Sequence, residues 1–286
     1  MKITKEDILN SLKLYGITDM TYKMKCLECI DKINDSISIK QKVSTMLDKV
    51  YIDTPKDLRD KYKKYTKEEM FEESMPDFIT NVILLLGYKI HVKNMEKMTK
   101  LQRDISIKRI NQCLKSSNLE EISISQMLWG VYIVIGRIID IGRLQYERCF
   151  FNPLTKEMED VVKIHIPKGE KLEYGEVINS LKESRYYINK YFNLDKYTYY
   201  CISWILSNKV LSIVDKNSNI AKFNKLFKVV LVEDGTCDIL HFVFNTSDND
   251  YSKLEENTTL QRGLKQKLLN GEKIDKGIGI LKKLDF

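Results

Sequence analysis

The sequence predicts an α+β protein, with a helical N-terminal domain followed by a mixed β-sheet domain that is flanked by helices. The 286 residues are 43% hydrophobic and 30% charged, which indicates a soluble folded chain able to bury a large core. Residues 1–120 carry apolar side chains at helical spacing, whereas segments with a period of two follow Gly142. We therefore expect a helical domain over residues 1–120 and an α+β domain over residues 121–286, divided between Ser116 and Ser125.

Capping residues and apolar stripes define the expected helices of the first half. Thr4 is an expected N-cap for a first helix that ends at Gly16, and residues 66–69 have the pattern of a capping box. The strongly apolar residues 124–139 are expected to form one helix that crosses the core. Further helices are expected over residues 22–34, 39–50, 55–62 and 100–114.

Alternating segments in the second half predict a sheet of five or six strands with helices on its faces. The segments 143–151 and 161–166 are separated by a turn and form a hairpin candidate. A second hairpin is expected from 227–232 and 239–244, because an Asp-Gly pair lies between them. Strands are also expected over 199–206 and 277–281, helices over 174–192 and 258–269, and a helical turn over 209–214.

The charge pattern gives no strong indication of a polyanionic partner. The net charge is +7, and acidic and basic residues mostly alternate. Residues 89–115 form the most basic segment, for which a solvated helix surface is favoured over a nucleic-acid stripe. Apolar runs are too short to span a bilayer, and residues 1–6 have no apolar stretch of signal-peptide type, so we expect a cytoplasmic protein without a membrane partner.

The cysteines and histidines do not form a metal-binding pattern. Cys26 and Cys29 make a C-x-x-C pair, but a structural zinc site needs two further ligands that usually form a second close pair. The three histidines are isolated from one another in the sequence. We therefore expect no metal, and interpret the pair as two buried thiols on one helix face.

Several short motifs occur in the second half in a fixed order. They are RLQYE (143–147), IHIPKG (164–169), CISWIL (201–206), SNIAKF (218–223) and TLQRGL (259–264). In this order they resemble bacterial acyltransferases that pair a helical N-terminal domain with a C-terminal domain like that of the GCN5-related N-acetyltransferases (GNAT). The resemblance covers residues 143–281 by motif and the first 120 residues by architecture only.

The resemblance implies an acyl-CoA-dependent N-acyltransferase with a GNAT-like C-terminal domain. Acetyl-CoA or another acyl-CoA would be the co-substrate, and a small-molecule amine would be the acceptor. The alternative is a non-catalytic ligand-binding or assembly protein on a degenerate acyltransferase scaffold. Neither the sequence nor the resemblance determines the oligomeric state.

Two departures from the family pattern weaken the catalytic interpretation. Ile202 stands where relatives usually have the histidine of a Cys-His-Ser-Trp motif. In addition, the chain has no Gln/Arg-x-x-Gly-x-Gly/Ala loop of the kind that binds a pyrophosphate. The start of the helix expected from Thr258, with Arg262 and Lys265 nearby, is the substitute that the sequence offers.

Acyl transfer to an amine needs a base, donors to the oxyanion and a proton for the leaving thiolate. Glu147 and His165 are the base candidates, because both lie on expected neighbouring strands; the alternatives are a surface charge and an ordinary strand histidine. Cys201 is a candidate nucleophile and Ser203 a candidate proton or hydrogen-bond donor. A buried thiol is the favoured alternative for Cys201.

Cofactor-binding candidates are four polar residues in the last third of the chain. They are Ser218, Asn219, Arg262 and Lys265. For Ser218 and Asn219 the alternative is a helix cap or turn, and for Arg262 it is a salt bridge to Glu255 or Glu256.

Overall fold

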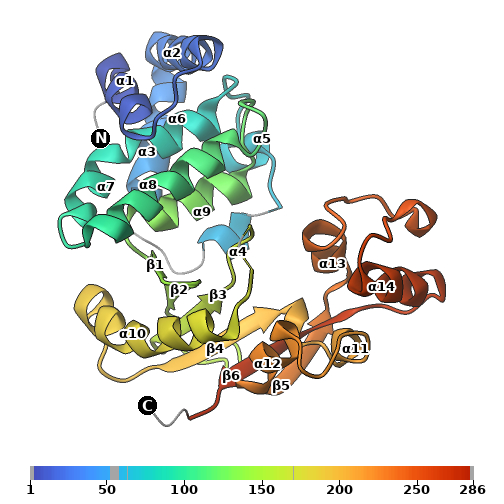
Figure 1. Cartoon of the computed structure of the whole chain (residues 1–286). Coiled ribbons are helices and arrows are strands. Elements are labelled where there is room, and N and C mark those ends of the chain that lie inside the picture. Colours follow the sequence, from blue (N-terminus) through green and yellow to red (C-terminus); the bar gives the residue numbers. More distant parts are fainter. Residues whose placement is uncertain (1–2, 52–57, 63, 170, 284–286) are drawn as a thin grey trace. The chain divides into compact units, whose positions relative to one another are not determined.

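A computed structural model describes residues 3–51, 58–62, 64–169 and 171–283. The chain forms two compact units, Met1–Ile139 and Asp140–Phe286 (Figure 1). The division lies later than the expected 120/121 boundary. The reason is that α9 (Ile124–Val134) packs on α6 (Ile79–Leu86) and α8 (Lys100–Lys115), and so adds its apolar side chains to the N-terminal core.

The N-terminal unit is helical, as predicted. Thr4 caps α1 by accepting a hydrogen bond from Asp7 N, and Thr66 forms the expected capping box at α5. Of the helix expected over 55–62, residues 55–57 lie outside the described part. The remaining helices are α1 (Lys5–Leu14), α2 (Met20–Asp35), α3 (Ile37–Tyr51), α4 (Leu58–Tyr62), α5 (Lys67–Phe71) and α7 (Tyr88–Met95).

Helix α6 lies at the centre of this unit, with all eight of its residues buried. The Tyr51 hydroxyl donates to the carbonyl oxygens of Ile83 (2.9 Å) and Leu84 (3.1 Å), near the end of the helix. Gly87 follows, and a Cβ atom there would lie 2.3 Å from the Tyr51 hydroxyl oxygen. Glycine at this position is therefore what allows the Tyr51 ring to close the helix end.

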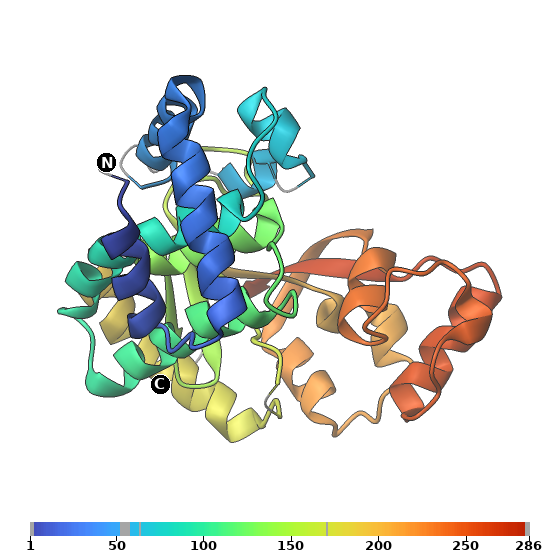
Figure 2. The ribbon, with the colours of Figure 1, turned by 90° about the horizontal axis from the view of Figure 1, so that it is seen from above.

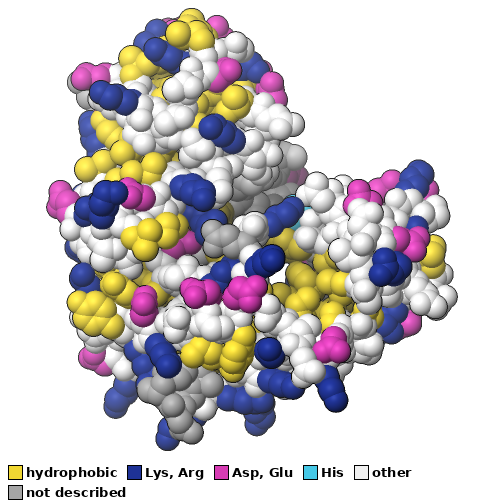
Figure 3. All heavy atoms as spheres, viewed as in Figure 1, with side chains coloured by type: hydrophobic (Ala, Val, Ile, Leu, Met, Phe, Trp, Pro, Cys, Tyr) yellow, Lys and Arg dark blue, Asp and Glu magenta, His cyan; other side chains and the backbone are white. Residues whose placement is uncertain are grey.

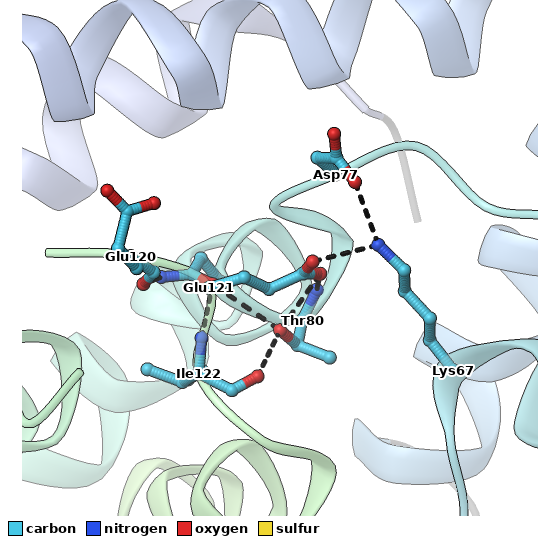
Figure 4. A network of polar contacts seen from close by, with 7 residues as sticks. Lys67, Asp77, Thr80, Glu120, Glu121 and Ile122 are labelled. Atoms are coloured by element: carbon cyan, nitrogen blue, oxygen red, sulfur yellow. Dashed lines mark hydrogen bonds and ion pairs between the residues drawn. The ribbon is translucent and has the colours of Figure 1, made fainter.

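A polar network fixes the segment before α9 to the start of α6 (Figure 4). The Glu121 carboxylate accepts hydrogen bonds from the backbone N–H (3.4 Å) and the hydroxyl group (3.3 Å) of Thr80, and it forms an ion pair with Lys67 Nζ at 2.9 Å. Lys67 also pairs with Asp77. The negative charge stands where the α6 dipole favours it, so we regard this network as structural.

The helix expected over residues 124–139 is shorter than predicted. Helix α9 ends at Val134, and Gly136 follows with φ of +73°, a left-handed conformation that suits glycine. Ile138 to Ile141 then form strand β1, which the sequence pattern does not predict. Apolar residues run through both elements, so their periodicity does not show where helix changes to strand.

The C-terminal unit contains a six-stranded mixed sheet with strand order β1-β2-β3-β4-β6-β5. Strands β2 and β3 pair antiparallel, as the first hairpin predicted. Strands β3 and β4 are parallel, and the expected helix α10 (Tyr174–Phe192) makes the crossover between them (Figure 1). The strand bounds are β1 (Ile138–Ile141), β2 (Leu144–Cys149), β3 (Val161–His165), β4 (Thr198–Ser203), β5 (Phe227–Asp234) and β6 (Asp275–Leu281).

The second expected hairpin is wrong. Thr236 to Phe242 form helix α13, and β5 pairs with β6 instead. Ile239 and Leu240 are adjacent and both buried, which is a helical rather than an alternating pattern. Helices α13 and α14 lie apart from α10 in both views (Figures 1 and 2). The other helices are α11 (Asn208–Leu211), α12 (Asn219–Lys225) and α14 (Thr259–Leu269), with short 3-10 turns at Trp204–Leu206 and Tyr251–Lys253.

Candidate active site

One face of the C-terminal sheet carries a row of polar side chains from β2 and β3. Glu147 lies opposite Lys163 in the antiparallel ladder, and Gln145 lies opposite His165. Directly opposed residues share a face of a sheet, and so do residues two apart in one strand. These four residues therefore lie on one side, which we call the polar face.

Glu147 and His165 are in contact on the polar face. His165 Nε2 lies 2.9 Å from Glu147 Oε2, and the two side chains are 18% and 7% exposed. An ionised carboxylate only accepts hydrogen bonds, so His165 donates from Nε2 to it, and a neutral imidazole with its proton there carries the lone pair on Nδ1. The structure thus brings together the two base candidates, with the carboxylate in the position that orients the imidazole ring.

The polar row continues toward β1. Gln145 Nε2 donates to Asp140 Oδ2 at 3.1 Å, and both residues are buried. Buried polar groups that bond one another hold a defined geometry. We therefore expect Asp140 and Gln145 to stiffen the strand pair that carries Glu147.

Cys201 and Ser203 lie on the other face of the sheet. Cys201 is opposite Ile164, which alternates with Lys163 and His165, and Ser203 shares the Cys201 face. Helix α10 covers this second face, where the hydroxyl groups of Tyr146 and Ser180 are 2.9 Å apart. The structure thus separates these two candidates from Glu147 and His165.

The local chemistry of Cys201 and Ser203 is structural. Burial raises the pKa of the Cys201 thiol to about 12, so at neutral pH the thiol stays protonated and is a weak nucleophile. Ser203 Oγ accepts a hydrogen bond from Ile205 N at 3.2 Å and so caps the turn after β4.

Replacing Cys201 by alanine is expected to leave the rate of acyl transfer within a few fold of the wild-type rate. The physical reason is that the protonated thiol faces α10 rather than the polar face. Steady-state kinetics of Cys201→Ala, with a thermal melt to confirm folding, test this. Loss of activity in a folded variant would show that the thiol takes part in the reaction.

Strand β4 extends past its ladder with β3. Among the described residues, the β3–β4 pairs end at Ile164 and Cys201, whereas β4 stays paired with β6 as far as Ser203. The backbone of Ile202 and Ser203 on the side toward β3 is therefore not part of the β3–β4 ladder. Ile202 alternates with Cys201, so its side chain lies on the polar face, as His165 does.

Ser218 and Asn219 begin helix α12 close to the start of α10. Ser218 Oγ accepts from Ala221 N and is the N-cap, which is the alternative role weighed above. Asn219 Nδ2 donates to the carboxylate of Glu173, the N-cap residue of α10, at 3.4 Å. Glu173 itself makes no side-chain capping hydrogen bond. The starts of two helices that follow β3 and β4 in the chain therefore lie together.

Arg262 and Lys265 interact with the segment before their own helix. Arg262 donates to the Glu256 carbonyl oxygen at 2.9 Å, and Lys265 pairs with the Glu256 carboxylate at 2.8 Å. Thr258 caps α14 with a capping box. Both cations line a surface hollow of about 630 Å³, with Ile213 and Thr259.

Comparison with known proteins identifies the C-terminal unit. Residues 138–281, half of the chain, match the family model described as "GNAT-like C-terminal domain". The chain belongs to this family. The match begins at β1 and ends with β6, so the GNAT-like domain is the six-stranded unit. No curated protein matches the sequence.

Solved structures with the same fold are acyltransferases. One, in complex with decanoyl-CoA, has a TM-score of 0.63 and 17% identity, covering 73% of this chain and 67% of that one. A second, with decanoyl-CoA and teicoplanin, has a TM-score of 0.62 and 17% identity, covering 72% and 67%. A mutant with octanoyl-CoA has a TM-score of 0.62 and 16% identity, covering 73% and 67%. At these identities the likeness establishes the fold.

Asp140 and Gln145 of the GNAT-like domain were not singled out from the sequence. Gln145 and Glu147 are two apart in a strand that is otherwise mostly apolar, and this spacing was the available signal. Asp140 lies in β1, a strand that was not predicted and whose first two residues were assigned to a helix, so no alternation with Gln145 could be read.

Other sequence features have local structural roles. In the basic segment, Lys89 pairs with Asp7 and Lys100 with Asp104. Basic and acidic side chains are also interspersed on the face shown in Figure 3. Cys26 and Cys29 are buried, and burial raises the pKa of the Cys26 thiol to about 12. Within the described residues, no group of three metal-binding side chains occurs, and no helix is long and apolar enough to cross a membrane.

Proposed function

We propose that this protein is an acyl-CoA-dependent N-acyltransferase and that the Glu147–His165 pair is its general base. The observation that carries the proposal is the 2.9 Å contact between His165 Nε2 and Glu147 Oε2 on one face of a GNAT-like domain. A carboxylate that orients a histidine is a common device for proton transfer near neutral pH.

In the proposed reaction, the Glu147–His165 pair is sufficient for both proton transfers. The acceptor nitrogen attacks the thioester carbonyl carbon, and its proton moves to His165 Nδ1. The C–S bond then breaks, and the imidazolium returns the proton to the departing thiolate, which leaves as free CoA. Glu147 stabilises the imidazolium during this cycle. Because the thiol of Cys201 faces the other side of the sheet, transfer is direct and forms no acyl-enzyme.

The acyl-CoA is proposed to lie where β3 and β4 part. The β4 edge at Ile202 and Ser203 presents backbone groups suited to the amides of the pantetheine arm. The adjacent start of α10, the neighbouring Ser218 and Asn219, and Lys168 in the β3–α10 loop provide donors and positive charge for phosphates. Arg262 and Lys265 remain proposals for the same role.

The proposed acceptor is a small molecule with an amine, because one similar acyltransferase was crystallised with decanoyl-CoA and teicoplanin. Similar acyltransferases were solved with decanoyl-CoA and octanoyl-CoA. The proposed acyl donors are therefore acetyl-CoA and acyl-CoAs with chains of medium length. A cytoplasmic location is part of this proposal, since acyl-CoA thioesters are made there.

A non-catalytic binding protein is the second candidate, and Ile202 on the polar face favours it. One experiment distinguishes the two candidate functions. Titration calorimetry with acetyl-, octanoyl- and decanoyl-CoA measures binding, and free-thiol release with a panel of amines measures turnover. Binding with amine-dependent release supports the enzyme, and binding without release supports the second candidate. Absence of binding to all three thioesters would contradict the enzyme, and amine-dependent turnover would contradict the non-catalytic protein.

A further inference from the structure

Strand β5 forms an exposed apolar edge of the sheet. It is the outermost strand beside β6, and within it Val230, Leu231 and Val232 are 42%, 47% and 54% exposed. The strand spans eight residues, Phe227–Asp234. A long apolar edge strand is a template for pairing with another strand, and soluble proteins usually cover or charge such edges.

The charges of β5 stand at opposite ends of its apolar stretch. The segment reads Lys228, three valines and a leucine, then Glu233. Within the described part of the chain, neither Lys228 nor Glu233 forms an ion pair or side-chain hydrogen bond. When a second copy of this segment lies antiparallel to the first, Glu233 of each copy lies opposite Lys228 of the other. The edge is therefore complementary in charge to a second copy of itself.

The β-bulge in β5 makes this pairing geometrically consistent. Lys228 lies opposite Ile280 and Glu233 opposite Lys276, with a register shift between Val229 and Leu231. The β6 partners of Lys228 and Glu233 are residues 280 and 276, which are four apart and so lie on one face of the sheet. Lys228 and Glu233 therefore share that face, although they are five residues apart in a strand that contains a bulge. Opposed residues in an antiparallel pair must share a face, and without the bulge these two would not.

We propose that two copies of this chain associate through antiparallel pairing of their β5 strands around a two-fold axis. The pairing places Lys228 of each copy opposite Glu233 of the other, and Val229 opposite Val232. It joins two six-stranded sheets into one continuous sheet. Both charges gain a partner, and each exposed apolar side chain gains an apolar neighbour on the opposite strand.

Sedimentation velocity of the full chain over a wide range of protein concentration tests the proposal. The wild-type protein is expected to show a concentration-dependent monomer–dimer equilibrium. Leu231→Asp is expected to abolish it, because the change places two carboxylates near the two-fold axis. Leu269→Asp on α14 is the matched control, since Leu269 is 56% exposed and lies outside the edge, and it should dimerise like the wild type.

Charge reversal gives the sharper test. Lys228→Glu alone and Glu233→Lys alone each create two like-charged pairs, and each should weaken the dimer by about tenfold or more. An equimolar mixture of these two variants restores both opposite-charge pairs in the heterodimer, so its association should return to near the wild-type level. Thermal melts of the separate variants check that each folds. A wild-type monomer at all concentrations, a dimer that survives Leu231→Asp, or a mixture no tighter than either variant alone would each overturn the proposal.

Discussion

Replacing His165 by glutamine is expected to lower the rate of acyl transfer by about 10²- to 10⁴-fold, the usual contribution of a positioned general base. Glutamine keeps a donor for the Glu147 carboxylate but cannot take up the amine proton. Binding of acyl-CoA should change by no more than a few fold, because the proposed thioester site is built from β4 and the start of α10. Single-turnover kinetics and calorimetry measure the two effects separately.

Two further variants control this experiment. Glu147→Gln retains the imidazole but removes the charge that orients it, so a smaller loss of rate is expected, together with a shift in the pH dependence of the rate. His241→Gln makes the same substitution at an exposed histidine on α13 and should leave the rate unchanged. Equal rates for His165→Gln and His241→Gln would exclude His165 as the base.

Acid is expected to destabilise the N-terminal unit by about 3 kcal/mol between about pH 7 and pH 4, through His91. His91 is fully buried, with Nδ1 3.0 Å from the Tyr15 hydroxyl oxygen and Nε2 2.6 Å from Ser106 Oγ. Burial lowers its pKa from 6.5 to about 4. As the pH falls below the unfolded-state pKa, the unfolded chain binds a proton that the folded chain excludes, so stability is lost until the folded pKa is reached.

Urea unfolding at several pH values measures this effect. Trp129 lies in α9 and the other tryptophan, Trp204, lies in the GNAT-like domain, so Trp129 fluorescence in a Trp204→Phe background follows the N-terminal unit. His91→Gln keeps hydrogen-bonding capacity without a titrating ring, and its stability should depend less on pH across this window. The same slope in both proteins would assign the acid sensitivity to other groups.

The sequence predicted elements that local signals define. Thr4 caps its helix and Thr66 forms its capping box as expected, since capping depends on residues within one turn. The failures lie where apolar residues run together. Ile138 joined an apolar helix in the prediction although it begins a strand, and Ile239 was assigned to a strand although it lies in a helix. Tertiary pairing decided both cases.

The candidate site was predictable within one hairpin but not across the sheet. Glu147 and His165 could be paired because an antiparallel hairpin brings alternating residues of neighbouring strands together. The relation of Cys201 to them depends on the parallel register with Ile164, which is set through a 19-residue crossover helix. A shift of one residue would exchange the two faces, so no sequence pattern could place Cys201.

The most direct test of the account is amine-dependent release of free CoA from decanoyl-CoA, measured side by side for the wild-type protein and His165→Gln. We expect release by the wild-type protein that depends on an added amine, and at least a hundredfold slower release by a folded His165→Gln variant that still binds decanoyl-CoA. Equal release by the two proteins would contradict the role assigned to the Glu147–His165 pair. Failure of the wild-type protein to bind any acyl-CoA would contradict the proposed function itself.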